Sequence, residues 1–162
     1  MADDTDIETL RRILRENRRI AVVGISAEWH RPSYFVGKYL LEHGYTMIPV
    51  NPKYAEVLGR RCYPSLSAAV ASGVQIDLVD CFRRAEDIGP IADEAIAAGA
   101  RCLWMQLGVV NEAAALRARA AGLDVVMDRC VKIEHGRLFG GLAWAGVNTR
   151  VISSRRPRQL PY

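Results

Sequence analysis

Residues 20–50, IAVVGISAEWHRPSYFVGKYLLEHGYTMIPV, contain two short apolar runs separated by a segment of helical character. Continuous apolar runs are typical of parallel strands that are buried on both faces, and a helix is the usual connection between two such strands. We therefore predict strands at 20–24 and 46–50 and a helix near 33–42, with Gly44 at the end of the helix. This unit indicates an α/β protein.

The same alternation of apolar runs and helical segments continues along the chain. Pro90 and Asn111 fit helix starts, while Gly99 and Gly122 fit helix ends. The pattern predicts a Rossmann-like, doubly wound, mainly parallel five-stranded sheet with helices on both faces. The further strands are expected at 76–82, 102–107 and 124–127, and the further helices near 65–71, 90–98 and 111–121, with a short helix or turn at 130–139.

The length and composition predict one domain. A chain of 162 residues, half of them apolar, builds one core but is short for two. We expect this domain to span residues 1–140 and to begin with a helix at about 5–17, where Thr5-Asp6-Ile7-Glu8 has capping-box spacing. Residues 141–162 are expected to form a basic extension that packs late or is mobile.

Hydropathy predicts no association with a membrane. No stretch approaches the roughly 18 to 20 apolar residues that a membrane span requires, and the first residues are acidic and polar, unlike a signal peptide. We expect a cytoplasmic protein.

The charged residues favour a phosphate-containing ligand, and the spacing of the cysteines gives no sign of a zinc or redox site. The net charge is +4, and nearly all the cationic residues are arginine, whose guanidinium suits phosphate groups. The arginines of the first helix resemble a nucleic-acid stripe, but such a run is more often a solvated helix face. The four cysteines form no Cys-x-x-Cys pair, so no zinc or redox motif is indicated, and Cys81 and Cys102 fit the core.

The loop after the first strand is a candidate anion site. Ligands of open parallel sheets bind beyond the carboxyl ends of the strands. Gly24 and Ser26 permit a close backbone turn, and the following helix would point its free N–H groups at the same place. Arg31 and Ser33 could add donors to a pyrophosphate. A plain turn remains the alternative for this loop.

The end of the second strand distinguishes between nucleotides. An NAD site normally has an acidic residue here, which accepts hydrogen bonds from the ribose. This sequence instead has Asn51, Pro52 and Lys53, which fit an additional phosphate on the ribose, as in NADP or the 3′-phosphorylated ADP of coenzyme A (CoA). A turn with an exposed Lys53 is the other reading. Arg83 and Arg84 follow the third strand and either face the same cleft or are solvated.

Seven motifs between residues 20 and 134 together resemble the small bacterial CoA-binding proteins, and the resemblance covers about residues 7–135. The motifs are IAVVGIS, RPSY, IPVNPK, YPSL, DLVDCFRR, WMQLGVVNEAA and VVMDRCVKIE. This family is similar to the CoA-binding domain of succinyl-CoA synthetase and implies a Rossmann-like fold that binds CoA. The resemblance further implies that Gly24, Ile25 and Ser26 contact the pyrophosphate, that Lys53 contacts the phosphorylated ribose and Phe82 with Arg83 the nucleotide end, and that the nucleotide groove continues along Gln106, Leu107 and Gly108.

Catalysis is not indicated. The synthetase needs a second domain with a phosphorylated histidine, which this chain is too short to include. Of the histidines, His43 fits a helix end, His30 lies in the candidate phosphate loop, and His135 is expected to be exposed. Cys130 would emerge at the ligand edge beside two cationic residues that favour its thiolate, so a mixed disulfide with CoA is a hypothesis.

The sequence therefore predicts a module that binds CoA or acyl-CoA through its 3′-phospho-ADP moiety, and more readily a non-catalytic one than an enzyme. The expected partner is this small molecule. An NADP-dependent oxidoreductase is the first alternative, and a nucleic-acid or protein interaction module is the second. The acyl group and a possible homo-oligomer are left open.

Overall fold

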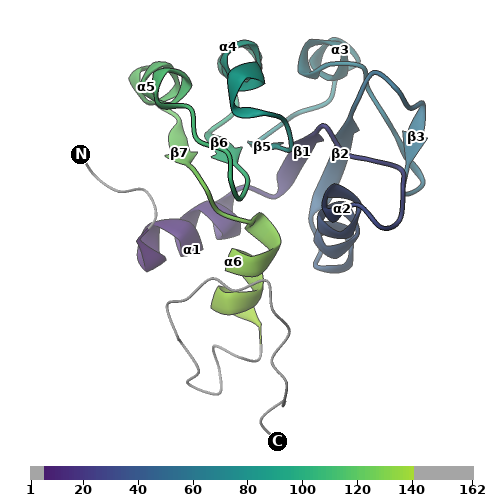
Figure 1. The fold of residues 1–162 in the computed structure, drawn as a ribbon, viewed down its shortest axis with the longest axis horizontal. Helices are drawn as coiled ribbons and strands as arrows, with labels where there is room; N and C mark the ends of the chain where they lie inside the picture. Colours follow the sequence, from purple (N-terminus) through teal and green to yellow (C-terminus); the bar gives the residue numbers. More distant parts are fainter. Residues whose placement is uncertain (1–5, 141–162) are drawn as a thin grey trace, which may run out of the picture.

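The computed structural model describes residues 6–140, and its centre is a five-stranded sheet (Figure 1). All neighbouring strands are parallel, and their order is β2-β1-β5-β6-β7. The fold expected from the sequence is confirmed. The strands are β1 (Arg19–Val23), β2 (Thr46–Val50), β5 (Leu78–Cys81), β6 (Cys102–Met105) and β7 (Asp124–Val126).

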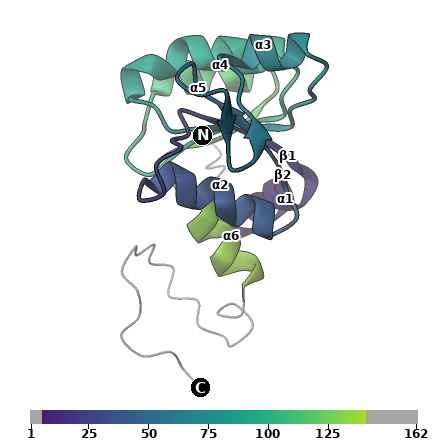
Figure 2. The ribbon, with the colours of Figure 1, turned by 90° about the vertical axis from the view of Figure 1, so that its right-hand side faces the viewer.

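Helices cover both faces of the sheet, as Figures 1 and 2 show. Each face has its own buried apolar core, because alternate residues of every strand point to opposite sides. One face packs against α3 (Leu66–Ala71), α4 (Ile88–Ala97) and α5 (Glu112–Ala120), and the other packs against α1 (Ile7–Glu16), α2 (Pro32–Glu42) and α6 (Val131–Phe139).

The helix boundaries follow local capping chemistry. Ser65 and Asn111 each accept a hydrogen bond from a backbone N–H of the helix they precede. Asp6, not Thr5, caps α1 by accepting from the Thr9 N–H at 3.0 Å, which shifts the expected capping box by one residue. A short 3₁₀ turn, η1 (Ala85–Asp87), leads into α4, so this helix begins before Pro90.

A small antiparallel hairpin, β3 (Glu56–Val57) and β4 (Arg60–Arg61), follows β2 and was not expected from the sequence. Its two-residue turn places both Leu58 and Gly59 at positive φ, 53° and 71°, as tight hairpin turns require. Strands of two residues are too short to produce an apolar alternation that sequence could reveal.

The order of the strands places a crevice at the carboxyl ends of β1 and β5. The chain passes from β1 to β2 on one side and later reaches β5 on the other side of β1. Loops diverge from the sheet at such a switch point and leave room for a ligand. The predicted extension at 141–162 lies outside the described residues. Within residues 6–140, no helix is long and apolar enough to cross a membrane.

Candidate ligand-binding site

Gly24 brings the loops after β1 and β5 together. Its φ is +86°, and a Cβ at this position would lie 2.2 Å from the Phe82 carbonyl oxygen. Only glycine tolerates both the left-handed backbone and this close approach. Gly24 therefore sets the spacing of the two loops that border the crevice.

The loop between β1 and α2 is held by its own polar side chains. The buried Ser33 hydroxyl accepts a hydrogen bond from the Ser26 N–H at 2.9 Å, and the Ser26 hydroxyl accepts one from the Glu28 N–H at 3.0 Å. Arg31 donates to the Glu28 carboxylate at 2.9 Å. Ser33 thus shapes the loop, and Arg31 is paired with a carboxylate rather than left free.

Asn51 connects the ends of β1 and β2. Its side-chain amide donates to the Ile25 carbonyl at 2.9 Å and accepts from the Lys53 N–H at 2.9 Å, and the residue is buried. Asn51 therefore positions the two loops. Lys53 is exposed, and its side chain makes no ion pair with any residue in the described range.

The charges around Glu28 show that this loop is electrostatically linked to Lys53. The hydrogen bond and the charge of Arg31 lower the pKa of Glu28, and the charges of His30 and Lys53 lower it further. Arg31, His30 and Lys53 therefore all act on the Glu28 carboxylate. An anionic ligand at this place would compete with Glu28 for them.

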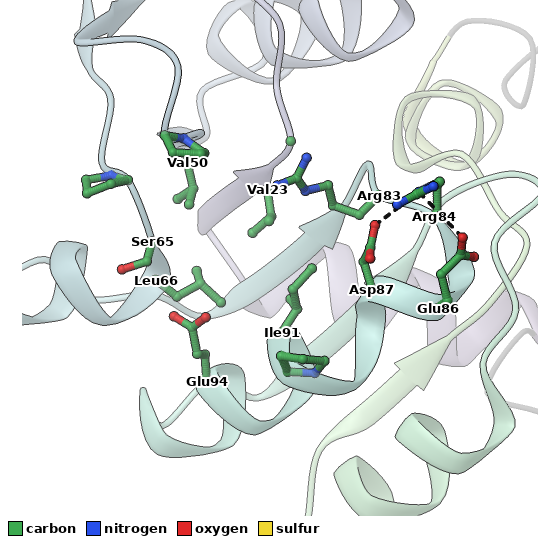
Figure 3. A pocket seen from close by; sticks show the side chains of 14 residues that line it. Val23, Val50, Ser65, Leu66, Arg83, Arg84, Glu86, Asp87, Ile91 and Glu94 are labelled. Atoms are coloured by element: carbon green, nitrogen blue, oxygen red, sulfur yellow. Dashed lines mark hydrogen bonds and ion pairs between the residues drawn. The ribbon is translucent and has the colours of Figure 1, made fainter.

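A polar cavity of about 450 Å³ opens beyond the ends of β1, β2 and β5, between α3 and α4 (Figure 3). Figure 3 shows Arg83 directed back toward Val23, while Arg84 extends between the Glu86 and Asp87 carboxylates. The Arg84 Nε lies 3.3 Å from Asp87 and 3.5 Å from Glu86, whereas Arg83 makes no ion pair within the described range. Arg83 is the free guanidinium of this cavity.

A second, apolar cavity of about 730 Å³ lies on the other side of the segment after β5. It is bordered by α2, the start of α6 and the loop after β6. The apolar cavity shares Arg83, Arg84 and Asp87 with the polar cavity. Its remaining walls are Pro32, Val36, Phe82, Gln106, Leu107, Val109, Cys130 and Ile133.

The two cavities gather about half of the residues predicted from the sequence. Gly24, Pro52 and Arg83 line the polar cavity, and Phe82, Arg83, Gln106, Leu107 and Cys130 line the apolar cavity. The others, which line neither cavity, are Ile25, Ser26, Arg31, Ser33, Asn51, Lys53 and Gly108.

Sequence reasoning missed the residues that helices contribute to these walls. Ser65 and Glu94 face the polar cavity from the start of α3 and from α4, and Val36 and Ile133 face the apolar cavity from α2 and α6. Ligand sites of open parallel sheets are expected at the ends of strands, whereas these four residues lie in helices or at the start of one. In the sequence, these residues could have been found only through Ser65 and Glu94, which are polar although they stand beside apolar helix positions.

Gly108 has a positive φ of 83°, and its N–H donates to the Asp128 carboxylate at 2.7 Å. This bond joins the loops after β6 and β7. Gly108 therefore holds the edge of the sheet in place next to Leu107.

A buried carboxyl lies beneath the apolar cavity. Asp80 lies on β5 between Val22 and Trp104 of the neighbouring strands and is completely buried. Gln106 donates to one of its oxygens at 2.5 Å, and the other oxygen has no partner in the described part of the protein. Burial raises the pKa of Asp80 to about 7, although the hydrogen bond from Gln106 lowers it.

Cys130 does not have the environment that the sequence suggested. Burial raises the pKa of its thiol and the nearby Asp80 raises it further, while the Ile133 N–H and Lys132 offset this only in part. The expectation of a stabilised thiolate is therefore wrong, because the cationic neighbours count for less than burial. The thiol still lines the apolar cavity.

His135 is buried, contrary to the expectation of an exposed residue. Its Nδ1 lies 2.8 Å from the Tyr39 hydroxyl, and the rings of His43 and Phe139 also pack against it. Burial, then the charges of His43 and Arg18, lower the pKa of His135 to about 4. The cause is α6, which folds back against α2. Within residues 6–140, no group of three or more His, Cys, Asp or Glu residues could hold a metal ion.

A family model described as "CoA binding domain" matches residues 18–136, which include every strand and both cavities. The chain belongs to this CoA-binding domain family. The family resemblance that the sequence motifs indicated is thus confirmed.

Individual relatives resemble the chain over most of its length. The chain is 39% identical over 126 residues to the uncharacterized protein YneT of Bacillus subtilis (strain 168), which covers 78% of this chain and 91% of YneT. A hypothetical protein from Pyrococcus horikoshii OT3 superposes with a TM-score of 0.79 and 43% identity, over 83% of this chain and 93% of the other.

A more distant structure is similar in fold alone. It is the dinucleotide forming acetyl-coenzyme A synthetase 1 of Ca. Korarchaeum cryptofilum, at 22% identity and a TM-score of 0.59. The match covers 68% of this chain and 26% of the synthetase.

Proposed function

We propose that the protein binds CoA or acyl-CoA through its 3′-phospho-ADP moiety and acts as a non-catalytic binding or regulatory module. The observation that carries this proposal is the end of β2, where Asn51 is followed by Lys53, which has no ion-pair partner among residues 6–140, and where the sequence Asn51-Pro52-Lys53 contains no acidic residue. A carboxylate at this position would repel a ribose phosphate, whereas a lysine attracts it. Membership in the CoA-binding domain family supports the same ligand.

The remaining charges fit a ligand with several phosphates. Arg83 is free to form a bidentate contact in the polar cavity, and Arg31 could exchange Glu28 for a phosphate. The loop from Ile25 to Ser33 lines neither cavity itself, but it runs from Gly24, which lines the polar cavity, to the first turn of α2, where Pro32 lines the apolar cavity. We assign the pyrophosphate to this loop and the 3′-phosphate to Lys53.

Three arginines, two in α1 and one at the start of β1, argue against the nucleic-acid alternative. Arg12 makes two hydrogen bonds to the Asp124 carboxylate, at 2.9 and 3.0 Å, and Arg19 lies 2.7 Å from Asp77. Arg11 is paired with Glu8 at 2.9 Å. Cations that already neutralise carboxylates release few counterions from a nucleic acid, so they add little affinity.

Calorimetric titration of the full chain with CoA, dephospho-CoA, NADP and NAD tests the proposal. CoA should bind more tightly than dephospho-CoA, because only CoA has the 3′-phosphate. Lys53→Ala should weaken CoA about tenfold, as expected for a contact to a charged group worth about 1.5 kcal/mol, and should leave dephospho-CoA unchanged. Lys38→Ala, on the exposed side of α2, is the matched control and should change neither.

The outcomes separate the alternatives. Binding of NADP without CoA would favour the oxidoreductase. Equal affinities for CoA and dephospho-CoA would refute the role of Lys53, and no binding of either would refute the proposed ligand.

A further inference from the structure

The two cavities adjoin but differ in chemistry. The polar cavity has ionised and hydroxyl groups on its walls, whereas the apolar cavity is walled mainly by aliphatic and aromatic side chains. The segment Phe82-Arg83-Arg84 separates them and contributes to both. A ligand with a charged end and an apolar end could cross this segment and occupy both cavities.

The apolar cavity has the dimensions and the walls of a small-molecule site. Its volume of about 730 Å³ lies within the range of roughly 300–1,000 Å³ that is typical of such sites. Val36 of α2, Ile133 of α6 and Phe82 after β5 give this cavity apolar walls from three different elements. Leu107 also lines this cavity, and 51% of its surface is exposed.

One polar group is fixed inside these apolar walls. Gln106 lines the apolar cavity, is only 4% exposed, and donates its amide N–H to Asp80. This hydrogen bond orients the side chain and leaves its carbonyl oxygen to accept from a ligand N–H. The second Asp80 oxygen is buried without a partner in the described residues, so the strand beneath the cavity has unused hydrogen-bonding capacity.

We propose that the apolar cavity holds the acylated end of a CoA thioester with an apolar acyl chain, while the polar cavity holds the nucleotide. This inference rests on the proposed function. The amide groups of the pantetheine arm would meet Gln106, and the acyl chain would lie between Val36 and Ile133. An acyl group with its own carboxylate does not fit as well, because Arg83 is directed toward Val23 of the polar cavity and is taken by the nucleotide, and Arg84 is already paired with Glu86 and Asp87.

Titration of the full chain with CoA and with acetyl-, butyryl-, hexanoyl- and succinyl-CoA tests this inference. Each methylene that the cavity buries should tighten binding by up to about fourfold, from a transfer free energy of about 0.8 kcal/mol. Affinity should therefore rise from CoA through hexanoyl-CoA and should be lower for succinyl-CoA than for butyryl-CoA.

Two variants locate the acyl chain. Ile133→Trp fills the apolar cavity from α6, and Leu107→Asp places a charge at its exposed rim, where folding is not at risk. Both should abolish the gain from the acyl chain, measured in each variant as the ratio of its affinities for hexanoyl-CoA and CoA, so that a change in the affinity for CoA itself is divided out. Leu116→Trp, on an exposed position of α5 away from both cavities, is the matched control and should preserve the gain.

The results distinguish this inference from the proposed function. CoA binding with no dependence on acyl length, or a preference for succinyl-CoA, would overturn the acyl site and leave CoA binding intact. A chain-length gain that survives in both variants would also overturn it. If neither CoA nor its thioesters bind, both proposals fail.

Discussion

The buried carboxyl of Asp80 should make the protein less stable as pH rises. Its pKa is about 7 in the folded state against 3.8 for an ordinary aspartate. Between these values the folded state retains a proton that the unfolded state releases, so the free energy of unfolding falls from about pH 4 to pH 7. At about 1.4 kcal/mol per pKa unit, the cost of the charged form is about 4 kcal/mol above pH 7.

Asp80→Asn removes this cost without changing the size of the side chain. We expect the free energy of unfolding of the variant, relative to the wild-type protein, to increase by about 4 kcal/mol between pH 4 and pH 8. Urea unfolding followed by circular dichroism at each pH measures this difference. Other groups, including His135, titrate in both proteins and cancel from the comparison.

Asp77 supplies a control of opposite sign. Burial alone would raise the pKa of Asp77, but hydrogen bonds and the charge of Arg19 lower it below its ordinary value. Asp77→Asn should therefore lose stability at neutral pH, and this loss should shrink in acid as the wild-type carboxylate is protonated. A flat difference between wild-type protein and Asp80→Asn from pH 4 to pH 8 would refute the reasoning about Asp80.

Three further predictions follow from the site and its surroundings. Gly24→Ala should lower the free energy of unfolding by more than the roughly 1–2 kcal/mol that a left-handed alanine costs, because its Cβ would clash with the Phe82 carbonyl. Gly59→Ala has open space around its Cβ and should lower it by only that amount, as urea unfolding would measure. Glu28→Gln should tighten CoA binding up to about fivefold in calorimetry, since an exposed pair with Arg31 is worth up to about 1 kcal/mol; weaker binding would contradict this. Between about pH 6.5 and 4, the imidazole of His135 is protonated in the unfolded state but stays neutral in the folded state, so the wild-type protein loses stability as pH falls. His135→Phe should remove this part of the acid instability, as thermal unfolding at several pH values would show.

The fold could be read from the sequence because each buried strand is a continuous apolar run. The five strands and the helices between them were predicted in the correct order, with ends displaced by a few residues. The hairpin at Glu56–Arg61 was missed, since its strands are too short to form a pattern. His135 was misjudged because its burial depends on the packing of α6 against α2, a contact between segments distant in the chain.

The site was predictable only where it consists of strand ends. Gly24, Phe82 and Arg83 follow strands and do meet at the crevice. Two other features depend on side-chain geometry, which the order of residues in the sequence does not contain. They are the ion pair of Arg31 with Glu28 and the hydrogen bond from the Asn51 side chain to the Ile25 carbonyl. The pKa of Cys130 is likewise raised because its thiol is buried in the folded protein, which its charged neighbours in sequence do not reveal.

The late position of α6 has a consequence for synthesis on the ribosome. Residues up to 126 contain all five strands, and they emerge first. Cys130, the residue before α6, and Ile133, within this last described helix, however, complete the wall of the apolar cavity. A nascent chain folds in the order in which it leaves the ribosome, at about 5–20 residues per second. The sheet can therefore assemble while the apolar cavity is still open on one side, and that cavity closes only when translation has passed α6.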